Sequence, residues 1–139
     1  MIIKTKFFGE VEIEDNLLLK FKEGIPGFDS YKEYAIIDVE DKKFKCLQSL
    51  DKEELCLILV SPWDYFEDYE IDLDDIDVKR LGIETQNDVL VLNIVTVREN
   101  IISANLLAPI IVNIKNRESA QIVMNTNKYS IREKIECLY

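Results

Sequence analysis

The sequence predicts an all-β fold, mainly antiparallel, that forms a small closed or nearly closed β-barrel with one or two short helices. Short runs of β-branched, aromatic and other apolar residues recur along the 139 residues, and charged or glycine-containing turns separate them. Only two segments have a helical pattern. A barrel is favoured over an open sandwich because closure removes exposed strand edges.

Eleven strands are expected, and each is a run that fits a half-buried or buried pleated surface. They lie at residues 2–8, 11–13, 17–21, 34–39, 44–50, 55–61, 69–73, 89–97, 101–107, 110–114 and 120–124. Pro109 interrupts the apolar run between residues 101 and 114. Since proline removes a ladder donor, an edge, a bend or a bulge is expected there.

Two helices are expected. A short one begins after Asp74 or Asp75, either of which can cap it, and ends at Leu81, where Gly82 supplies the left-handed residue that follows many helices. The second covers residues 129–138, in which the isoleucines and a leucine have helical spacing.

Length and composition predict a single domain over residues 1–139. The chain is 47% hydrophobic and 32% charged, as in ordinary globular proteins. No linker or repeat is visible. No apolar run approaches the ~20 residues of a membrane helix, and no signal-type apolar core follows the N-terminus, so a cytoplasmic location is expected.

The sequence contains few residues suited to catalysis or metal binding. The chain has no histidine, which excludes mechanisms that need an imidazole and leaves only carboxylate-, lysine- or tyrosine-based catalysis. Cys46, Cys56 and Cys137 are far apart, without a CxxC pair, and are expected to be structural free thiols; a zinc site built from them is the alternative. No catalytic, cofactor-binding or metal-binding residue is predicted, and no small-molecule substrate.

Most of the net charge of −10 comes from one stretch, DYFEDYEIDLDDID at residues 64–77, which has eight acidic side chains and no basic one. Apolar residues alternate with the acids from residue 69 to 73, as in a strand with one wet face. Three interpretations stay open: a solvated edge, a surface for a basic partner, or a cation site, although the EF-hand spacing is absent. The candidate acidic surface comprises Asp68, Glu70, Asp72, Asp74, Asp75 and Asp77.

The same charge argues against direct nucleic-acid binding. Phosphate contacts depend on clustered Lys and Arg, whereas this chain has a pI near 4.5. It could nevertheless attract a protein that itself binds nucleic acid.

The stretch EGIPGF at residues 23–28 is predicted to form a tight turn. Pro26 suits position i+1 of a type II turn, and Gly27 accepts the positive φ required at i+2. Turn chemistry does not explain Ile25 and Phe28. They either pin the loop onto the barrel or form an exposed apolar patch for a partner.

Uncharged amides near strand ends complete the candidate partner-binding set. Such amides satisfy backbone groups at a corner, or pair with the backbone of an incoming chain. The full set is Ile25, Pro26, Phe28, Gln48, Trp63, Asn105, Asn113 and Gln121.

These motifs, in this order, resemble those of the FliW family of flagellar assembly factors, over almost the whole chain. The main matching stretches are Gly24-Ile25-Pro26-Gly27-Phe28, Leu47-Gln48-Ser49, Ser61-Pro62-Trp63, Ala104-Asn105-Leu106-Leu107-Ala108-Pro109-Ile110 with Val112-Asn113, and Gln121-Ile122-Val123 followed by Tyr129. The sequence departs from the family after Tyr129, where relatives commonly have a basic, proline-containing tail. Trp63 occupies a position at which the identity of the aromatic residue varies within the family.

The resemblance implies a small β-barrel without enzymatic activity that has two protein partners. One is newly made flagellin, and the other is the RNA-binding translational repressor CsrA. Flagellin bound to the factor leaves CsrA free to repress flagellin messenger RNA, and export of flagellin frees the factor to antagonise CsrA. From charge, the acidic stretch suits CsrA, whereas the apolar turn and the amides suit flagellin.

Two other functions are alternatives. An enzyme would need a carboxylate pair in a cleft, for example two of Asp72, Asp74 and Asp75. An oligonucleotide-binding barrel could stack bases on Phe7, Phe8 and Tyr34, but the basic groove that it requires is missing.

Overall fold

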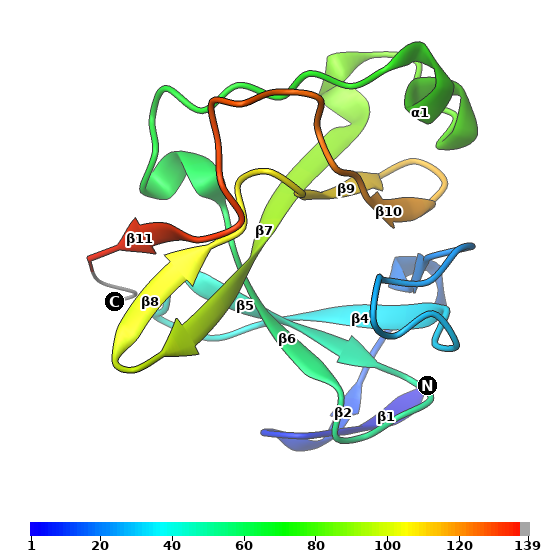
Figure 1. Ribbon diagram of the computed structural model, residues 1–139. Coiled ribbons are helices and arrows are strands. Elements are labelled where there is room, and N and C mark those ends of the chain that lie inside the picture. The colour runs from blue at the N-terminus through cyan, green and yellow to red at the C-terminus, as the bar shows by residue number, and fades with distance from the viewer. Residues whose placement is uncertain (137–139) are drawn as a thin grey trace.

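The computed structural model describes residues 1–136, and the mostly antiparallel β fold that the sequence predicts is confirmed (Figure 1). The strands are β1 (Ile2–Thr5), β2 (Gly9–Glu12), β3 (Leu19–Lys20), β4 (Glu33–Asp38), β5 (Phe44–Ser49), β6 (Cys56–Val60), β7 (Val89–Arg98), β8 (Ile101–Ala104), β9 (Ile110–Asn113), β10 (Ser119–Gln121) and β11 (Glu133–Ile135). One α-helix, α1 (Asp75–Arg80), is accompanied by short 3-10 turns at Asp15–Leu17, Pro62–Asp64 and Gln86–Asp88.

One curled sheet forms the body of the molecule, with the order β10-β9-β7-β6-β5-β4-β3. Its two end strands approach each other at a parallel bridge between Lys20 and Glu118, where the Lys20 N–H donates to the Arg117 carbonyl over 3.0 Å. The barrel is therefore nearly closed. The β1–β2 hairpin forms a separate two-stranded sheet.

The long strand β7 organises the sheet because it pairs with three others. β6 lies along one edge of β7, while β9 pairs with the first half of the other edge and β8 with its second half. The segment between β8 and β9 bends near Pro109, where the sequence predicts an irregularity. The bend transfers the chain from one half of β7 to the other.

Two clusters of buried apolar side chains fill the barrel. Leu19, Phe21, Tyr34, Leu59 and Ile110 belong to the first, inside the curl of β3 to β7. The second lies under β7, β8 and β11 and continues beneath the segment that precedes α1. Both clusters combine residues from distant parts of the chain, which ties the barrel together as one unit.

The predicted strand at residues 69–73 is wrong. This segment is extended, with Tyr69 buried and its acidic neighbours exposed, but no strand within residues 1–136 pairs with it. Side chains bind its backbone instead: the Trp63 indole N–H donates to the Tyr69 carbonyl (2.9 Å), and the Glu70 N–H donates to the Tyr129 hydroxyl (2.9 Å). The alternating pattern predicted the sidedness correctly, but sidedness alone does not create a strand.

The predicted helix at residues 129–138 is also wrong within the described chain. Residues 133–135 form β11, which pairs antiparallel with β8, and Ile135 is buried whereas Ile131 is 53% exposed. The open edge of β8 supplies backbone partners that a surface helix could not use. The last part of the prediction, residues 137–139, lies outside the described residues.

The first helix is confirmed, from Asp75 to Arg80, with Gly82 at positive φ just after it. Asp74 occupies the N-cap position, but its side chain makes no capping hydrogen bond. Several strands are shorter than expected. Residues 6–8 turn the chain between β1 and β2, residues 15–17 form a 3-10 turn before β3, and β8 and β10 stop at Ala104 and Gln121.

Candidate functional site

The EGIPGF loop has the predicted tight turn. The Phe28 N–H donates to the Ile25 carbonyl over 2.7 Å, with Pro26 and Gly27 between them and Gly27 at a φ of 90°. Ile25 is 1% exposed and belongs to the core, whereas Pro26 is exposed and Phe28 is half-buried against the same core. Ile25 is thus an anchor that no partner can reach in this conformation, and Phe28 is both anchor and surface.

The conformation of the loop requires glycine at position 24. Its φ is +72°, and a Cβ at this position would lie 2.5 Å from the Asp29 carbonyl oxygen. Any other residue would meet both a backbone clash and an unfavourable left-handed conformation. The close packing of the loop on its own backbone therefore requires glycine at this position.

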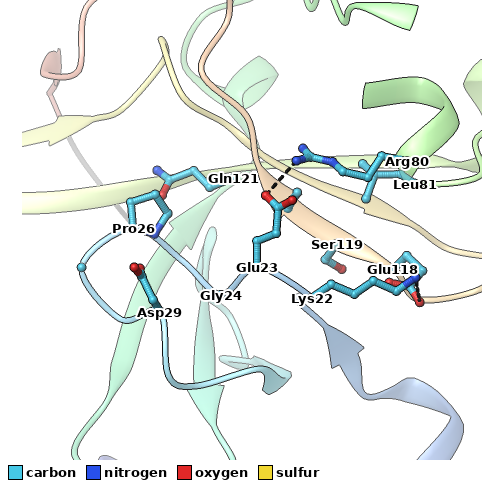
Figure 2. Close-up of a pocket in the computed structure, with 12 residues that line it drawn as sticks. Lys22, Glu23, Gly24, Pro26, Asp29, Arg80, Leu81, Glu118, Ser119 and Gln121 are labelled. Atoms are coloured by element: carbon cyan, nitrogen blue, oxygen red, sulfur yellow. Dashed lines mark hydrogen bonds and ion pairs between the residues drawn. The ribbon is translucent and has the colours of Figure 1, made fainter. Parts of the chain in front are cut away.

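A pocket of about 350 Å³ lies between this loop and strand β10 (Figure 2). Pro26 and Gln121, two of the sequence-predicted residues, both line it. Two ion pairs cross its rim: Arg80 with Glu23 (2.9 Å) and Lys22 with Glu118 (3.7 Å). The loop is held to the end of α1 and to the β9–β10 hairpin by charges as well as by packing.

Gln48 and Asn113 have structural roles. Gln48 is fully buried, accepts the Lys6 N–H and donates to the carbonyls of Ser49, Glu53 and Leu55. Asn113 is 2% exposed, donates to the Leu81 carbonyl over 2.8 Å and thereby holds the end of α1. Neither side chain can meet a partner while these bonds exist, because each satisfies buried backbone groups.

Asn105 and Gln121 are half-buried at the bend around Pro109. The Asn105 side chain accepts the Ala108 N–H (2.9 Å), and the Gln121 side chain donates to the Ala108 carbonyl (3.1 Å). Both amides stabilise the bend, and each keeps part of its surface accessible.

The acidic surface is an exposed face. Asp68, Glu70, Asp72, Asp74 and Asp75 are exposed, and Asp77 is half-buried. Glu70 approaches Lys128 (3.8 Å) and Asp77 binds Arg80 (3.0 Å). Within residues 1–136, the other four carboxylates have no ion-pair partner.

Aromatic side chains anchor the start of this acidic segment. Tyr69 packs between Trp63 (ring centroids 6.0 Å apart) and Tyr129 (4.7 Å), and its hydroxyl donates to the Leu106 carbonyl. Burial raises the pKa of Tyr69 to about 12. Trp63 remains 44% exposed, and it is not among the residues that line the pocket beside Pro26.

The cysteines agree with the structural interpretation where they are described. Cys46 and Cys56 are free thiols on the neighbouring strands β5 and β6. A hydrogen bond from the Cys56 thiol lowers the pKa of Cys46. Cys137 lies outside the described residues.

The three aromatic residues that could stack on bases differ in their exposure. Phe7 and Phe8 are exposed on the β1–β2 hairpin, with ring centroids 6.4 Å apart, but Tyr34 is fully buried. A stacking platform that includes Tyr34 is therefore not available.

Sequence reasoning missed the charged rim of the pocket, namely Lys22, Glu23, Arg80 and Glu118. Glu23 and Arg80 are 57 positions apart, and no local pattern signals that a loop and a helix end will meet. Only the closure of the barrel brings these residues together.

The structure defines a small, mainly antiparallel β-barrel protein whose candidate site is spread over the EGIPGF loop, a proline bend and one acidic segment. Among residues 1–136, no helix is long and apolar enough to span a membrane.

Comparisons with known proteins identify the family. The FliW protein family matches residues 2–135. Flagellar assembly factors FliW of Clostridium novyi (strain NT) and Bacillus subtilis (strain 168) are each 41% identical over 138 residues, which cover 97% of this chain and 96% of theirs. The crystal structure of a flagellar assembly factor FliW superposes with a TM-score of 0.91 at 36% identity, covering 96% of both chains. The chain therefore belongs to the FliW family, as its motifs indicated.

Proposed function

We propose that this flagellar assembly factor acts in the cytoplasm by binding two protein partners in turn, flagellin monomer and the translational repressor CsrA, and that it has no catalytic activity. Membership of the FliW family supports the flagellar role. The finer assignment to these partners rests on the resemblance of its motifs and on the chemistry of its surfaces.

The observation that carries the CsrA assignment is the acidic segment. Its exposed carboxylates lie on one continuous stretch of chain, and four of them have no ion-pair partner among residues 1–136. A repressor that grips RNA phosphates needs a basic surface, so it is complementary to this face. Bound there, the factor would also repel RNA from the repressor.

Flagellin is assigned to the pocket beside the rigid turn. Pro26 and Gln121 line this pocket and combine apolar surface with one amide that can bind a backbone. Phe28 does not line the pocket, but its half-buried side chain adds apolar surface to the same loop. The unassembled termini of flagellin are amphipathic and lack their partners, and such segments are suited to a pocket in which apolar side chains stand among charged and polar ones.

One partner replaces the other on the factor if their binding is mutually exclusive or negatively coupled. Each partner then weakens the other by the same factor, because linkage is reciprocal. Export of flagellin would release the factor to antagonise CsrA, and flagellin translation would resume.

The proposal is tested first by size-exclusion chromatography of the purified protein with flagellin monomer, and separately with CsrA. We expect a co-eluting complex in each mixture, and loss of one complex when the other partner is added in excess. Failure to form either complex would reject both assignments.

Neutralising Asp68, Asp72, Asp74 and Asp75 together to Asn is expected to weaken CsrA binding by about tenfold at low salt, since complementary charge drives this contact. The salt dependence of the affinity should also fall, while flagellin binding is retained. Isothermal titration calorimetry at two salt concentrations measures both effects.

The matched control neutralises four exposed carboxylates elsewhere, Glu10, Glu12, Glu14 and Glu40, to Gln. It removes the same charge from other surfaces of the molecule. If both variants weaken CsrA binding equally, only the net charge matters and the acidic segment is not the site.

Phe28→Ala is expected to weaken flagellin binding about tenfold, since aromatic anchors dominate such contacts, with a modest loss of melting temperature because Phe28 also packs on the core. The control is Phe44→Ala, which truncates another half-buried phenylalanine in the other core cluster. Equal effects of the two variants on flagellin affinity would show that general destabilisation is responsible.

A further inference from the structure

A second hollow of about 540 Å³, here called the acid-rimmed groove, lies on the inner side of the acidic segment. Its walls come from the extended segment before α1, from α1 itself, from the loop after it and from the start of β7. The apolar residues that line it are Trp63, Ile71, Leu73, Val78, Ile83, Val89 and Val91.

Apart from Val91, which is buried, these apolar side chains are accessible in spite of their contacts with the core. Ile71, Leu73, Ile83 and Val89 pack on the core with one side and remain half-buried. Trp63, the only tryptophan of the chain, is 44% exposed. A contiguous apolar hollow of this kind is uncommon on a protein that has no use for it.

One carboxylate lines this apolar floor, and two others are neighbours in the chain of residues that line it. Asp72 and Asp74 alternate with the lining residues Ile71 and Leu73, and Glu84 lines the groove directly. Asp72, Asp74 and Glu84 are exposed, and no ion pair in residues 1–136 involves them. An occupant must therefore combine apolar side chains that face inward with cationic side chains at the edges.

We propose that the acid-rimmed groove binds an amphipathic segment of a protein partner, with apolar residues on one face and Lys or Arg on the other. A second copy of this chain does not fit, because its net charge of −10 would be repelled by the rim. A purely acidic or neutral segment would leave the rim carboxylates without partners in a partly desolvated contact.

The identity of the partner rests on the proposed function, in which the basic repressor CsrA is the ligand of the acidic segment. The chemistry of the occupant does not depend on that assignment. The groove and the repressor can therefore be tested separately.

The probe is a fluorescein-labelled peptide built from Leu and Lys, spaced so that the leucines share one face of a helix. A control peptide has Glu in place of Lys. We expect saturable binding of the Leu/Lys peptide by anisotropy, no binding of the Leu/Glu peptide, and a blue shift of Trp63 emission with an unlabelled Leu/Lys peptide, because the indole becomes covered.

Val78→Arg places a bulky cation in the groove and is expected to weaken peptide binding by about tenfold. Ile76→Arg is the matched control, since Ile76 is on the same helix, is 78% exposed and does not line the groove. If Val78→Arg lowers the melting temperature substantially, Asp72→Asn combined with Glu84→Gln removes rim charge without changing the apolar packing, and it should weaken binding at low salt.

Equal affinities of the Val78→Arg and Ile76→Arg proteins for the peptide, or saturation without a change in Trp63 emission, would overturn the proposal. A wild-type protein that binds the peptide but forms no complex with CsrA would leave the groove in place and reject only the repressor as its partner. A CsrA complex that persists while the peptide does not bind would reject the groove alone.

Discussion

Tyr34 and Tyr69 are both buried tyrosines, but only the Tyr69 hydroxyl has a hydrogen-bond partner. Tyr69 donates to the Leu106 carbonyl, whereas the Tyr34 hydroxyl has no partner among the described residues. Burial is the main cause that raises the pKa of each to about 12. Two residues of the same type thus contribute differently to stability.

We expect Tyr69→Phe to lower the free energy of unfolding by about 1 kcal/mol, because the variant leaves a buried carbonyl without its donor. Tyr34→Phe should change it by less than ~0.5 kcal/mol or increase it, since the lost hydroxyl had no partner. Urea denaturation at neutral pH measures both. A larger loss for Tyr34→Phe would show that its hydroxyl is satisfied in solution.

Alkaline pH should destabilise the protein through the same tyrosines. The folded-state pKa of Tyr34, about 12, lies above the ordinary value of 10.0, so its contribution is complete below pH 10 and is lost as the pH rises toward 12. The melting temperature of Tyr34→Phe should therefore fall less steeply over this range than that of the wild type. Parallel profiles would contradict the raised pKa.

At the scale of elements, residues 69–73 and 133–135 show that periodicity does not decide pairing. The first segment alternates like a strand, yet its backbone is bound by the side chains of Trp63 and Tyr129. The second lies within residues 129–138, whose apolar residues have helical spacing, yet it pairs with β8. In each case a tertiary partner outweighed the local pattern, as happens when short segments have weak intrinsic preferences.

Ile135→Ala is expected to lower the free energy of unfolding by about 2 kcal/mol, as for other large-to-small changes in a core, because Ile135 is 3% exposed in β11. Ile131→Ala is the control and should cost less than ~0.5 kcal/mol, since Ile131 is 53% exposed. Chemical denaturation compares the two. Similar losses would instead favour a helix that buries both isoleucines on one face.

At the scale of the whole molecule, the barrel has one weak seam. Every other neighbouring pair along the main sheet has a ladder of at least two residue pairs, whereas β3 and β10 meet only at the bridge between Lys20 and Glu118. The pocket beside Pro26 opens next to this seam. The proposed flagellin surface therefore lies where the barrel is least tightly closed.

Native-state hydrogen exchange should reveal this seam. The Lys20 amide, which donates to the Arg117 carbonyl (3.0 Å), is expected to exchange through local opening, while the Leu59 amide in the central strand β6 exchanges only with global unfolding. NMR exchange rates at several low denaturant concentrations separate the two. Equal protection of both amides would mean that the seam opens only when the whole barrel unfolds.

The features that the sequence predicts best are those that depend on neighbouring residues in the chain. Pro26 with Gly27 specifies a tight turn, Gly82 marks the end of α1, and apolar runs mark the strands, because each depends on neighbours in the chain. Sequence reasoning was weakest for the candidate site. The sequence could not distinguish Gln48 and Asn113, which satisfy buried backbone groups, from Gln121, which lines a pocket.

The sequence by itself therefore determined the all-β class, the family and the acidic segment, since these depend on composition, motif order and local backbone preference. Only the tertiary structure decided that Ile25 is an anchor while Pro26 and part of Phe28 remain at the surface. It alone brought Glu23 to Arg80 and formed an apolar groove lined in part by Ile71 and Leu73 of the acidic segment. Such contacts depend on how distant strands meet around a shared core, and no local pattern in the chain encodes that meeting.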